Sequence, residues 1–300
     1  MLQVHRLSVQ FRSPRDPEKS ICAVRSLDLR IEAGELVAVI GQSGAGKSLL
    51  AHAILGLLPS NAALSGTILF HGRNLAPDEI HRLRGRHMTL IPQSVSALNP
   101  LRRVGDQLAR AARRNGHPSP RHAVFDALER FSLAPTVAKR FPFQLSGGMA
   151  RRVLTALATM GGAELILADE PTNGLDPETA HESLAILRQL ADQNRAVMVI
   201  THDIEAILPV ADRIVVFCAG MTLEDGPAAV FASGTPHHPY SQALLAALPS
   251  RDFRAASTLS ADPTGCFLTD SCPHAFDSCH HEIPPLRPMG AGWVRCWRHA

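Results

Sequence analysis

The segment GQSGAGKS, residues 41–48, constrains the fold of this chain more than any other stretch. The continuous apolar run ELVAVIG leads into it and is typical of a strand buried on both faces of a sheet. The helical run LLAHAILGLL follows it. The segment matches the pattern G-x-x-x-x-G-K-[ST], in which backbone N–H groups turn inward to hold phosphate oxygens. The sequence therefore predicts a nucleotide-binding loop between a strand and a helix.

The polar groups of this loop have separate expected roles. Glycines allow the tight turn, and the N-terminus of the following helix adds partial positive charge. Lys47 is expected to reach the outer phosphates, and the Ser48 hydroxyl to ligate Mg²⁺. The alternative, a glycine-rich turn that contains a lysine by chance, does not account for the flanking strand and helix. The predicted binding residues are Gly41, Ser43, Gly44, Gly46, Lys47 and Ser48.

Composition limits the classes of protein to which this chain can belong. Hydrophobic residues make up 45% of the 300, enough for a sizeable core, and the net charge of +3 does not by itself indicate nucleic acid. No apolar run reaches the length of a membrane-spanning helix, about 18 residues. The N-terminal stretch MLQVHRLSVQF alternates like a strand and lacks the features of a signal peptide. We therefore expect a cytoplasmic chain in which disulfides do not form.

The hydrophobic pattern divides the chain into three regions and a tail. Residues up to about 90 alternate with period two, as half-buried antiparallel strands do. Residues from about 100 to 160 have helical spacing, with Pro and Gly between the helices. From ELILADE onward, strands and helices alternate, which predicts a mostly parallel α/β sheet covered on both faces. After about residue 234 comes a tail rich in Pro, His and Cys.

Four polar residues follow predicted core strands. Asp169 and Glu170 end the strand LILADE, where the carboxyl edge of the sheet meets the nucleotide. Asp169 is expected to hold Mg²⁺, and Glu170 to polarise the water that attacks the γ-phosphate. His202 ends the next strand and is expected to touch the γ-phosphate, and Gln93 can complete the Mg²⁺ or water shell. Taken singly, each also has a structural interpretation, such as solvated acids at a strand end or a structural histidine.

A second anion-binding signal lies about a hundred residues after the first. Residues 145–149 read LSGGM, and the amphipathic run ARRVLTALATM follows them. A serine and two glycines at a helix N-terminus suit an anion. One nucleotide does not need two such segments from the same chain, so the second segment requires another explanation.

In this order, GQSGAGKS, Gln93, LSGGM, LILADE, GLD and His202 resemble the ATP-binding-cassette (ABC) ATPases over about residues 2–232. The resemblance implies a P-loop NTPase (RecA-like) core with an antiparallel β subdomain and an α-helical subdomain inserted at about 95–160. It implies that residues 1–234 form the nucleotide-binding domain and residues 235–300 a C-terminal extension. It also implies hydrolysis of ATP to ADP and phosphate, with Mg²⁺, coupled to transport.

In this family two such domains stack head to tail, which explains the second anion-binding segment. The resemblance implies that Ser146, Gly147 and Gly148 hold the γ-phosphate of a nucleotide bound to a partner domain, and that Asp176 couples the two sites. Phe11 matches the position at which the family stacks an aromatic ring on adenine, although a core phenylalanine fits the pattern nearly as well. Met149 and Arg151 stand where glutamines are usual. Neither change removes a phosphate donor, so activity is expected.

Two further segments point to the peptide and nickel importers of the family. SVSALNPLRRVGDQL, after Gln93, and HPYSQALLAALP, residues 238–249, resemble stretches typical of that branch. The implied partners are a second ATPase subunit, identical or paralogous, two membrane-spanning subunits and an extracytoplasmic solute-binding protein. The chain would then lie peripherally on the cytoplasmic face of the membrane, and no nucleic acid is expected.

The tail contains four cysteines, and it resembles the cysteine-bearing extension of the oligopeptide and dipeptide members. Four thiolates suffice for a [4Fe–4S] cluster, which the resemblance implies. Zinc with His274, His280 or His281 among its ligands is the alternative, and unligated thiols are a third interpretation. Cys22 and Cys218 lie in strand-like runs and are expected in the core. The tail cysteines are Cys266, Cys272, Cys279 and Cys296.

Other function classes remain as alternatives. A soluble ABC ATPase that acts on DNA or the ribosome would usually carry coiled-coil arms or two cassettes in one chain, which are missing here. A regulatory module with little hydrolysis is disfavoured by the intact Glu170 and His202. An arginine cluster in the helical region suggests solvation or contact with lipid headgroups and membrane subunits more than nucleic acid, because no aromatic residues alternate with it. Its members are Arg102, Arg103, Arg110, Arg113 and Arg114.

Overall fold

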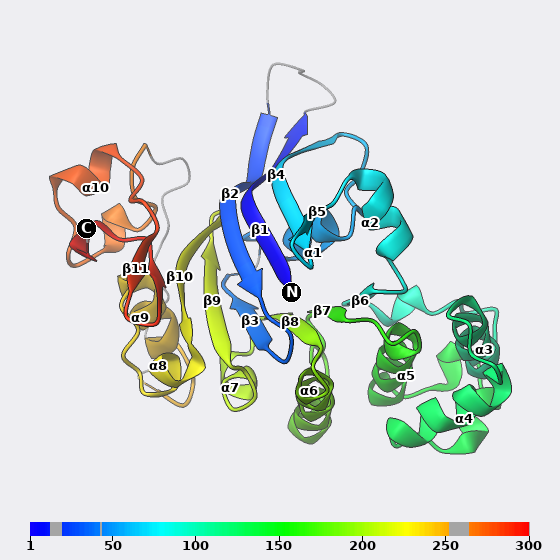
Figure 1. The fold of residues 1–300 in the computed structure, drawn as a ribbon. Coiled ribbons are helices and arrows are strands. Elements are labelled where there is room, and N and C mark those ends of the chain that lie inside the picture. Colours follow the sequence, from blue (N-terminus) through cyan, green and yellow to red (C-terminus); the bar gives the residue numbers. More distant parts are fainter. Residues whose placement is uncertain (13–19, 43, 252–263, 300) are drawn as a thin grey trace.

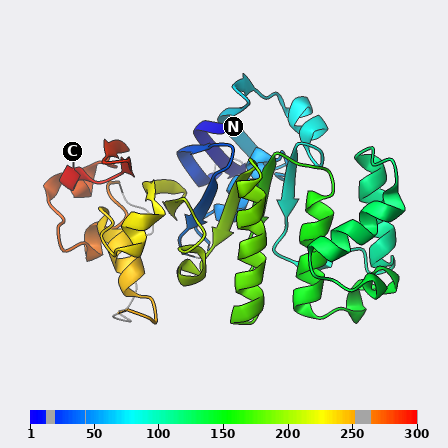
Figure 2. The ribbon, with the colours of Figure 1, turned by 60° about the horizontal axis from the view of Figure 1, so that its bottom comes forward.

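The computed structural model describes residues 1–12, 20–42, 44–251 and 264–299. Two sheets form the centre of the molecule (Figure 1). A group of helices extends from one edge of the larger sheet, and the C-terminal extension extends from the other edge. Figure 2 also shows these two parts at opposite ends of the molecule.

The smaller sheet is antiparallel and has the strand order β2-β1-β4-β5. Its inward side chains alternate along β1, where Leu2, Val4, Leu7 and Val9 are fully buried. This is the period-two pattern that the sequence predicts for the first ninety residues. The strands are β1 (Leu2–Arg12), β2 (Ser20–Ile31), β4 (Ala62–Phe70) and β5 (Arg73–Asn74).

The larger sheet has eight strands in the order β11-β12-β10-β9-β3-β8-β7-β6. The five strands from β9 to β6 are parallel, and β10, β12 and β11 extend the sheet in antiparallel fashion. The parallel strands are β3 (Leu36–Ile40), β6 (Met88–Ile91), β7 (Leu165–Asp169), β8 (Ala196–Thr201) and β9 (Arg213–Cys218). The antiparallel strands are β10 (Met221–Pro227), β11 (Arg287–Met289) and β12 (Gly292–Val294).

Alternate residues of β3 belong to two hydrophobic cores, one on each face of the larger sheet. Val37 and Val39 pack with α1 and the smaller sheet. Leu36, Ala38 and Ile40 pack with α6 and α7 on the other face. Every residue of β3 is therefore buried, as the continuous apolar run predicts. The helices are α1 (Lys47–Ile54), α2 (Pro77–Leu83), α6 (Pro177–Asp192) and α7 (Ile204–Ile207).

The helical region has a hydrophobic core of its own, built around side chains such as Leu108, Leu128 and Val153. It begins after β6 and returns to the sheet at β7, so it is an insertion between two neighbouring parallel strands. Its helices are η1 (Val95–Ala97), α3 (Val104–Arg114), α4 (Pro120–Arg130), η2 (Pro135–Lys139), η3 (Pro142–Gln144) and α5 (Gly147–Thr159).

The C-terminal extension is folded onto the larger sheet. Strand β12 pairs with β10 through Val294 opposite Glu224, which makes the sheet continuous into the extension. The tail that the sequence describes only by composition thus contains regular elements. They are α9 (Pro239–Ala246), η4 (Thr269–Ser271), α10 (Asp277–His281) and η5 (Trp297–His299), besides β11 and β12. The helix α8 (Ala228–Ala232) lies just before the extension.

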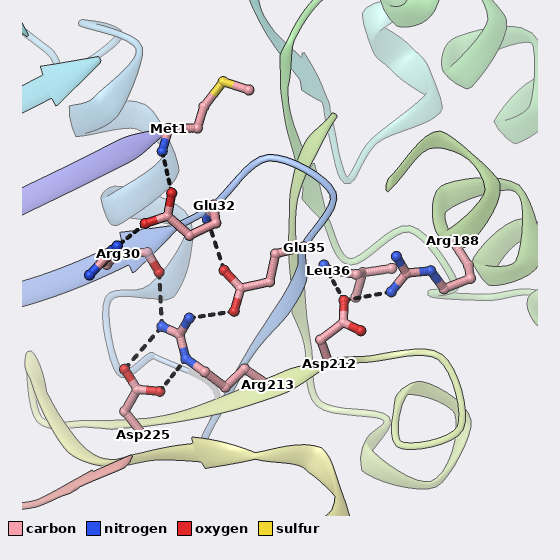
Figure 3. Close-up of polar contacts among 9 residues, drawn as sticks. All are labelled: Met1, Arg30, Glu32, Glu35, Leu36, Arg188, Asp212, Arg213 and Asp225. Atoms are coloured by element: carbon pink, nitrogen blue, oxygen red, sulfur yellow. Dashed lines mark hydrogen bonds and ion pairs between the residues drawn. The ribbon is translucent and has the colours of Figure 1, made fainter. Parts of the chain in front are cut away.

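A network of charged side chains joins the two sheets (Figure 3). Arg213, at the start of β9, forms ion pairs with Asp225 of β10 and with Glu35, which precedes β3. Its guanidinium also donates to the backbone carbonyl of Arg30 in β2, at 2.8 Å. Three acceptors satisfy one partly buried cation, so the network fixes how β2 of the smaller sheet lies against the larger one.

A second cation, Arg188 of α6, fixes the helix to the same edge of the sheet (Figure 3). It pairs with Asp212 at 2.6 Å, and Asp212 also accepts from the backbone N–H of Leu36 at 2.7 Å. The start of β3 is therefore held by a side chain from the loop before β9. These contacts position the strand that leads into the phosphate loop.

Candidate nucleotide site

The phosphate loop connects β3 to α1 through two glycines that have no substitute. Gly41 has φ 151°, and a Cβ there would lie 2.0 Å from the carbonyl oxygen of Phe217. Gly46 has φ 98° at the N-cap of α1, and a Cβ there would lie 2.7 Å from the carbonyl oxygen of Ala23. Both the turn and the close neighbours therefore require glycine. Ser43, predicted as part of this site, lies outside the described residues.

Lys47 lies inside the loop and is 6% exposed. Its ammonium donates to the carbonyl oxygens of Gly41 at 2.7 Å and Gln42 at 2.9 Å. Burial lowers the pKa of Lys47 from its ordinary value, and the nearby carboxylates of Glu170 and Asp169 oppose that shift. The loop is thus organised around a cation that a phosphate can share.

Ser48 and Asp169 come together from α1 and β7. The Ser48 hydroxyl donates to Asp169 Oδ1 at 3.1 Å. Burial raises the pKa of Asp169, the Ser48 hydrogen bond acts in the opposite direction, and the charge of Glu170 raises it further. A hydroxyl and a carboxylate in this arrangement are oxygen ligands of the kind that Mg²⁺ prefers, so the residues present fit the expected ion.

Glu170 follows β7 with a strained backbone and points its carboxylate at His202. Its φ of 48° lies in the left-handed region, which is uncommon for residues other than glycine. Its N–H donates to the Ile200 carbonyl at 2.8 Å, and its carboxylate lies 2.8 Å from His202 Nδ1. The Glu170 side chain is 12% exposed and that of His202 58% exposed. Backbone strain held in place at a strand end is typical of a functional carboxylate.

Gln93 lies two residues beyond β6 and its side chain is exposed. Its backbone carbonyl accepts a hydrogen bond from Arg151 at 2.7 Å. Arg151 belongs to α5, so the helix that begins at the serine–glycine segment contacts the loop that contains Gln93.

The serine–glycine segment begins α5, as its sequence predicts. Ser146 is the N-cap, and its Oγ accepts from the Met149 N–H at 3.3 Å. A Cβ on Gly148 would lie 2.9 Å from Cγ2 of Thr179 in α6. Thr179 in turn donates to both carboxylate oxygens of Asp176, at 3.0 Å from its N–H and 2.7 Å from its hydroxyl. These hydrogen bonds lower the pKa of Asp176.

The two anion-binding segments of one chain do not meet. The phosphate loop follows β3, whereas α5 packs beside β6, and β8 and β7 lie between these strands. Three strand spacings amount to about 14 Å. Figure 1 accordingly shows α1 and α5 as separate helices on different parts of the sheet.

Phe11, which the resemblance places against adenine, is the penultimate residue of β1. It pairs with Ile21 of β2 and packs, partly buried, against the first hydrophobic core. Stacking of Phe11 on adenine stays a prediction.

Of the two cysteines expected in the core, Cys218 is buried, and burial raises its pKa to about 12, whereas Cys22 is only half-buried.

The four cysteines of the extension line one small cavity between α9, α10 and η5. All four are free thiols, and His274 lines the same cavity. Burial raises the pKa of the Cys266 and Cys296 thiols, and the other nearby cysteines add to this effect. Within the described ranges, however, no group of three or more His, Cys, Asp or Glu side chains has the geometry of a bound metal ion. The clustering of the four thiols is therefore the only structural observation that favours the predicted zinc or iron–sulfur centre, which stays a prediction.

The sequence does not reveal two participants in the site. Thr179 is the residue that contacts Gly148 and holds Asp176, and the spacing D-x-x-T at a helix start was the available signal. Arg151 stands out in the sequence only as a departure from a usual glutamine. Its burial and its contact with the Gln93 loop become visible only in the structure.

Comparison with known proteins decides the family. A family model described as ABC transporter matches residues 24–173. The chain is 34% identical to the oligopeptide transport ATP-binding protein OppD of Salmonella typhimurium, over 98% of this chain and 92% of OppD. The chain belongs to the ABC transporter family. It is also 34% identical to the dipeptide transport ATP-binding protein DppD of Escherichia coli, over 97% of this chain and 94% of DppD.

Solved structures agree with this assignment. A dimeric post-hydrolysis state of the ATP-binding cassette MJ0796, bound to ADP and phosphate, is similar with a TM-score of 0.68 and 26% identity. The similarity covers 76% of this chain and 99% of that one. The predicted fold, a P-loop NTPase core with an antiparallel β subdomain and inserted helices, is confirmed. The chain is an ATPase of an ABC importer, and these relatives give no support to a role on nucleic acid or the ribosome.

Across the part of the chain that the structure describes, no helix has the length and apolar character needed to cross a bilayer.

Proposed function

We propose that this chain is one of two ATPase subunits that drive uptake of oligopeptides or dipeptides through membrane-spanning partners. The observation that carries this proposal is the near-complete alignment with OppD and DppD, which includes the extension as well as the cassette. Both relatives are named for peptide transport. The sequence left uptake of nickel open, but we propose peptide uptake because both of these relatives are named for it.

In the proposed reaction each chain supplies part of two sites. Lys47 and the loop N–H groups bind the phosphates of one ATP, and Ser48, Asp169 and Gln93 hold Mg²⁺, which neutralises phosphate charge. Glu170 accepts a proton from the attacking water, and His202 keeps that carboxylate oriented through its 2.8 Å contact.

The second half of each site comes from a partner chain in this proposal. Ser146, Gly147 and Gly148 begin α5, where the helix N-terminus favours an anion. Because they lie about three strand spacings from β3, they serve a nucleotide held by another copy or a paralogue. Asp176 lies beside this segment through Thr179, and we assign it the coupling of the two sites. The dimeric cassette MJ0796 is a solved example of such an assembly.

The inserted helices of this chain offer a surface that could bind the membrane-spanning partner. A groove of about 480 Å³ lies between β6 and α3, and Arg102, Arg110 and Arg114 line it. Leu101, beside the groove, is 86% exposed. An exposed apolar side chain beside cationic ones suits a segment of another protein that carries both apolar and acidic side chains. We infer that the chain lies peripherally at the cytoplasmic face of the membrane, in a system that includes an extracytoplasmic solute-binding protein.

The extension is proposed to hold an iron–sulfur cluster. Cys266, Cys272, Cys279 and Cys296 lie around one cavity and none is paired in a disulfide. Together these four thiolates would supply the number of ligands that a [4Fe–4S] cluster needs. When bound, such a cluster cross-links the extension. Iron and acid-labile sulfide in equal amounts after anaerobic purification would support it, and stoichiometric zinc without iron would reject it.

The decisive experiment for the function uses Glu170→Gln. The variant keeps the shape of the side chain but cannot accept the proton, so it should bind ATP, form a stable dimer by light scattering, and lose at least about 100-fold in turnover. Matched measurements on Glu178→Gln, an exposed acid in α6, should leave turnover unchanged. Wild-type turnover in Glu170→Gln would remove Glu170 from the mechanism. A chain that stays monomeric with saturating ATP, alone and with its partner, would remove the shared site.

A further inference from the structure

A cavity of about 400 Å³ adjoins the phosphate loop on the side of the smaller sheet. Gly44, Ala45 and Gly46 of the loop form one wall, and Ile21, Cys22 and Ala23 of β2 form another. Residues 218–220, at the turn from β9 to β10, form a third, and Phe267 of the C-terminal extension forms a fourth. Four separate parts of the chain therefore line this space, and one of them is not part of the cassette.

The position and size of the cavity suit a nucleoside. When the loop holds the phosphates, the ribose and base must leave it on one side, and this cavity opens directly from the loop residues. Its volume lies in the usual range of small-molecule pockets, about 300–1,000 Å³. We propose that the C-terminal extension supplies part of the nucleoside-binding surface, through the ring of Phe267. This inference rests on the proposed ATPase function and adds a contact from outside the cassette.

Phe267 is held firmly at this place. It is 4% exposed and follows Cys266, whose N–H donates to the Cys279 carbonyl at 2.8 Å. The Thr269 hydroxyl closes the segment from the other side, with bonds of 2.7 Å to the Cys266 carbonyl and 2.8 Å to the Cys279 carbonyl. The ring is therefore oriented before any ligand binds, and a pre-oriented contact costs little entropy on binding.

Arg25 of β2 lines the same cavity and packs against the Phe267 ring. Its guanidinium carbon lies 5.6 Å from the centroid of that ring. A cation within about 6 Å of a ring centroid is attracted to the face of the ring. Arg25 therefore helps to hold Phe267 at the wall of the cavity.

The contact also links nucleotide affinity to the fold of the extension. Cys266, the neighbour of Phe267, lines the cysteine cavity, so one short segment belongs to both places. Any event that displaces this segment would withdraw the ring from the nucleoside. The extension thus acts as a nucleotide-binding element as well as an appendage.

The test compares ATP with inorganic triphosphate, which has no nucleoside. Phe267→Ala in the full chain should weaken ATP binding by about 5- to 20-fold, as loss of an aromatic contact predicts, and leave triphosphate binding unchanged. The KM for ATP should rise by a similar factor, while kcat at saturating ATP stays within about twofold. Phe267→Leu, which keeps most of the apolar volume, should fold like the wild type and show the same effect on ATP in weaker form.

Trp293→Ala is the matched control, since this aromatic residue of the extension is 48% exposed and lines neither the nucleoside cavity nor the cysteine cavity. It should leave ATP affinity unchanged. If both Phe267 variants bind ATP as the wild type does, the inference is wrong although the ATPase function stands. Equal weakening of ATP and triphosphate would also overturn it, because the effect would then come from the phosphate loop. A wild-type chain that binds no ATP would instead contradict the proposed function.

Discussion

Arg151 connects α5 to two separate loops of this ATPase. It is 4% exposed and donates to the carbonyl oxygens of Pro92 at 3.0 Å and Gln93 at 2.7 Å. It also donates to the carbonyl of Asn173, at 3.4 Å, in the loop between Glu170 and Asp176. Burial lowers its pKa, although the charge of Asp169 acts against the shift. Arg151 thus joins α5 to the loop that contains Gln93 and to the loop that follows Glu170. Both loops are predicted to flank the γ-phosphate.

We expect Arg151→Met to lower kcat by at least about 10-fold and to destabilise the fold by roughly 2–4 kcal/mol, because three carbonyl oxygens lose a charged donor. Arg151→Gln, which retains an amide donor and restores the residue usual in the family, should recover most of kcat. Steady-state ATPase assays and urea unfolding measure the two effects separately. If kcat of both variants simply follows the loss of stability, Arg151 has only a structural role.

The sequence predicted the residues of the phosphate loop because their chemistry is fixed by local spacing. Gly41, Lys47 and Ser48 act within one turn, so their roles depend little on the rest of the fold. The contacts of Arg151 and Thr179 depend on how α5 and α6 pack, and spacing along the chain contains no such information. Phe267 is the extreme case, since more than two hundred residues separate it from the loop that it adjoins.

At the scale of elements, the junction of β10 and β12 decides whether the extension belongs to the main sheet. Asp225 pairs with Trp293, and a Cβ on the neighbouring Gly292 would lie 2.0 Å from the Asp225 carbonyl oxygen. The two strands can therefore approach only because residue 292 lacks a side chain. In contrast, a Cβ on Gly226 of β10 would meet only Phe231, at 3.8 Å.

Gly292→Ala should accordingly push β12 away from β10 and loosen the extension, whereas Gly226→Ala should not. Limited proteolysis followed by mass spectrometry should then show faster cleavage of residues 264–299 in Gly292→Ala, with an intact cassette. Because Phe267 belongs to the loosened part, the KM for ATP should rise as well. Equal proteolysis of the two variants would show that this strand pairing does not hold the extension.

The central strands were predictable and the two strands of the extension were not, for a physical reason. β3, β7 and β8 are buried on both faces, so each is a continuous apolar run in the sequence. β11 and β12 have three residues each, and their pairing with the sheet comes from backbone contacts rather than from an apolar pattern. The sequence accordingly predicted the extension and its cysteines by resemblance, but no helix or strand within residues 235–300.

At the scale of the whole molecule, His238 lies where the extension leaves the cassette. It is 1% exposed, its Nδ1 accepts from the Tyr240 N–H at 2.9 Å, and its own N–H donates to Glu224 of β10 at 3.0 Å. Burial lowers the pKa of His238 from 6.5 to about 4. The folded chain therefore holds this imidazole neutral at pH values where the unfolded chain protonates it.

This difference fixes the direction of a pH effect on stability. The depressed pKa contributes no penalty above about pH 6.5, and the folded state loses stability as the pH falls from there toward 4, because only the unfolded state binds the proton. The full loss amounts to roughly 2–4 kcal/mol. Urea unfolding at pH 7.5 and pH 5 should thus show a marked decrease for the wild type, and a smaller one for His238→Gln, which has no proton to gain.

His237→Gln supplies the comparison, because the adjacent backbone contact to Glu224 remains in that variant while the imidazole of His238 is untouched. Its pH dependence should match that of the wild type. If His238→Gln loses as much stability between pH 7.5 and pH 5 as the wild type, the acid sensitivity arises elsewhere. If it loses less, the junction between cassette and extension is the acid-sensitive part of the molecule, and mild acid should raise the KM for ATP by displacing Phe267 before the cassette unfolds.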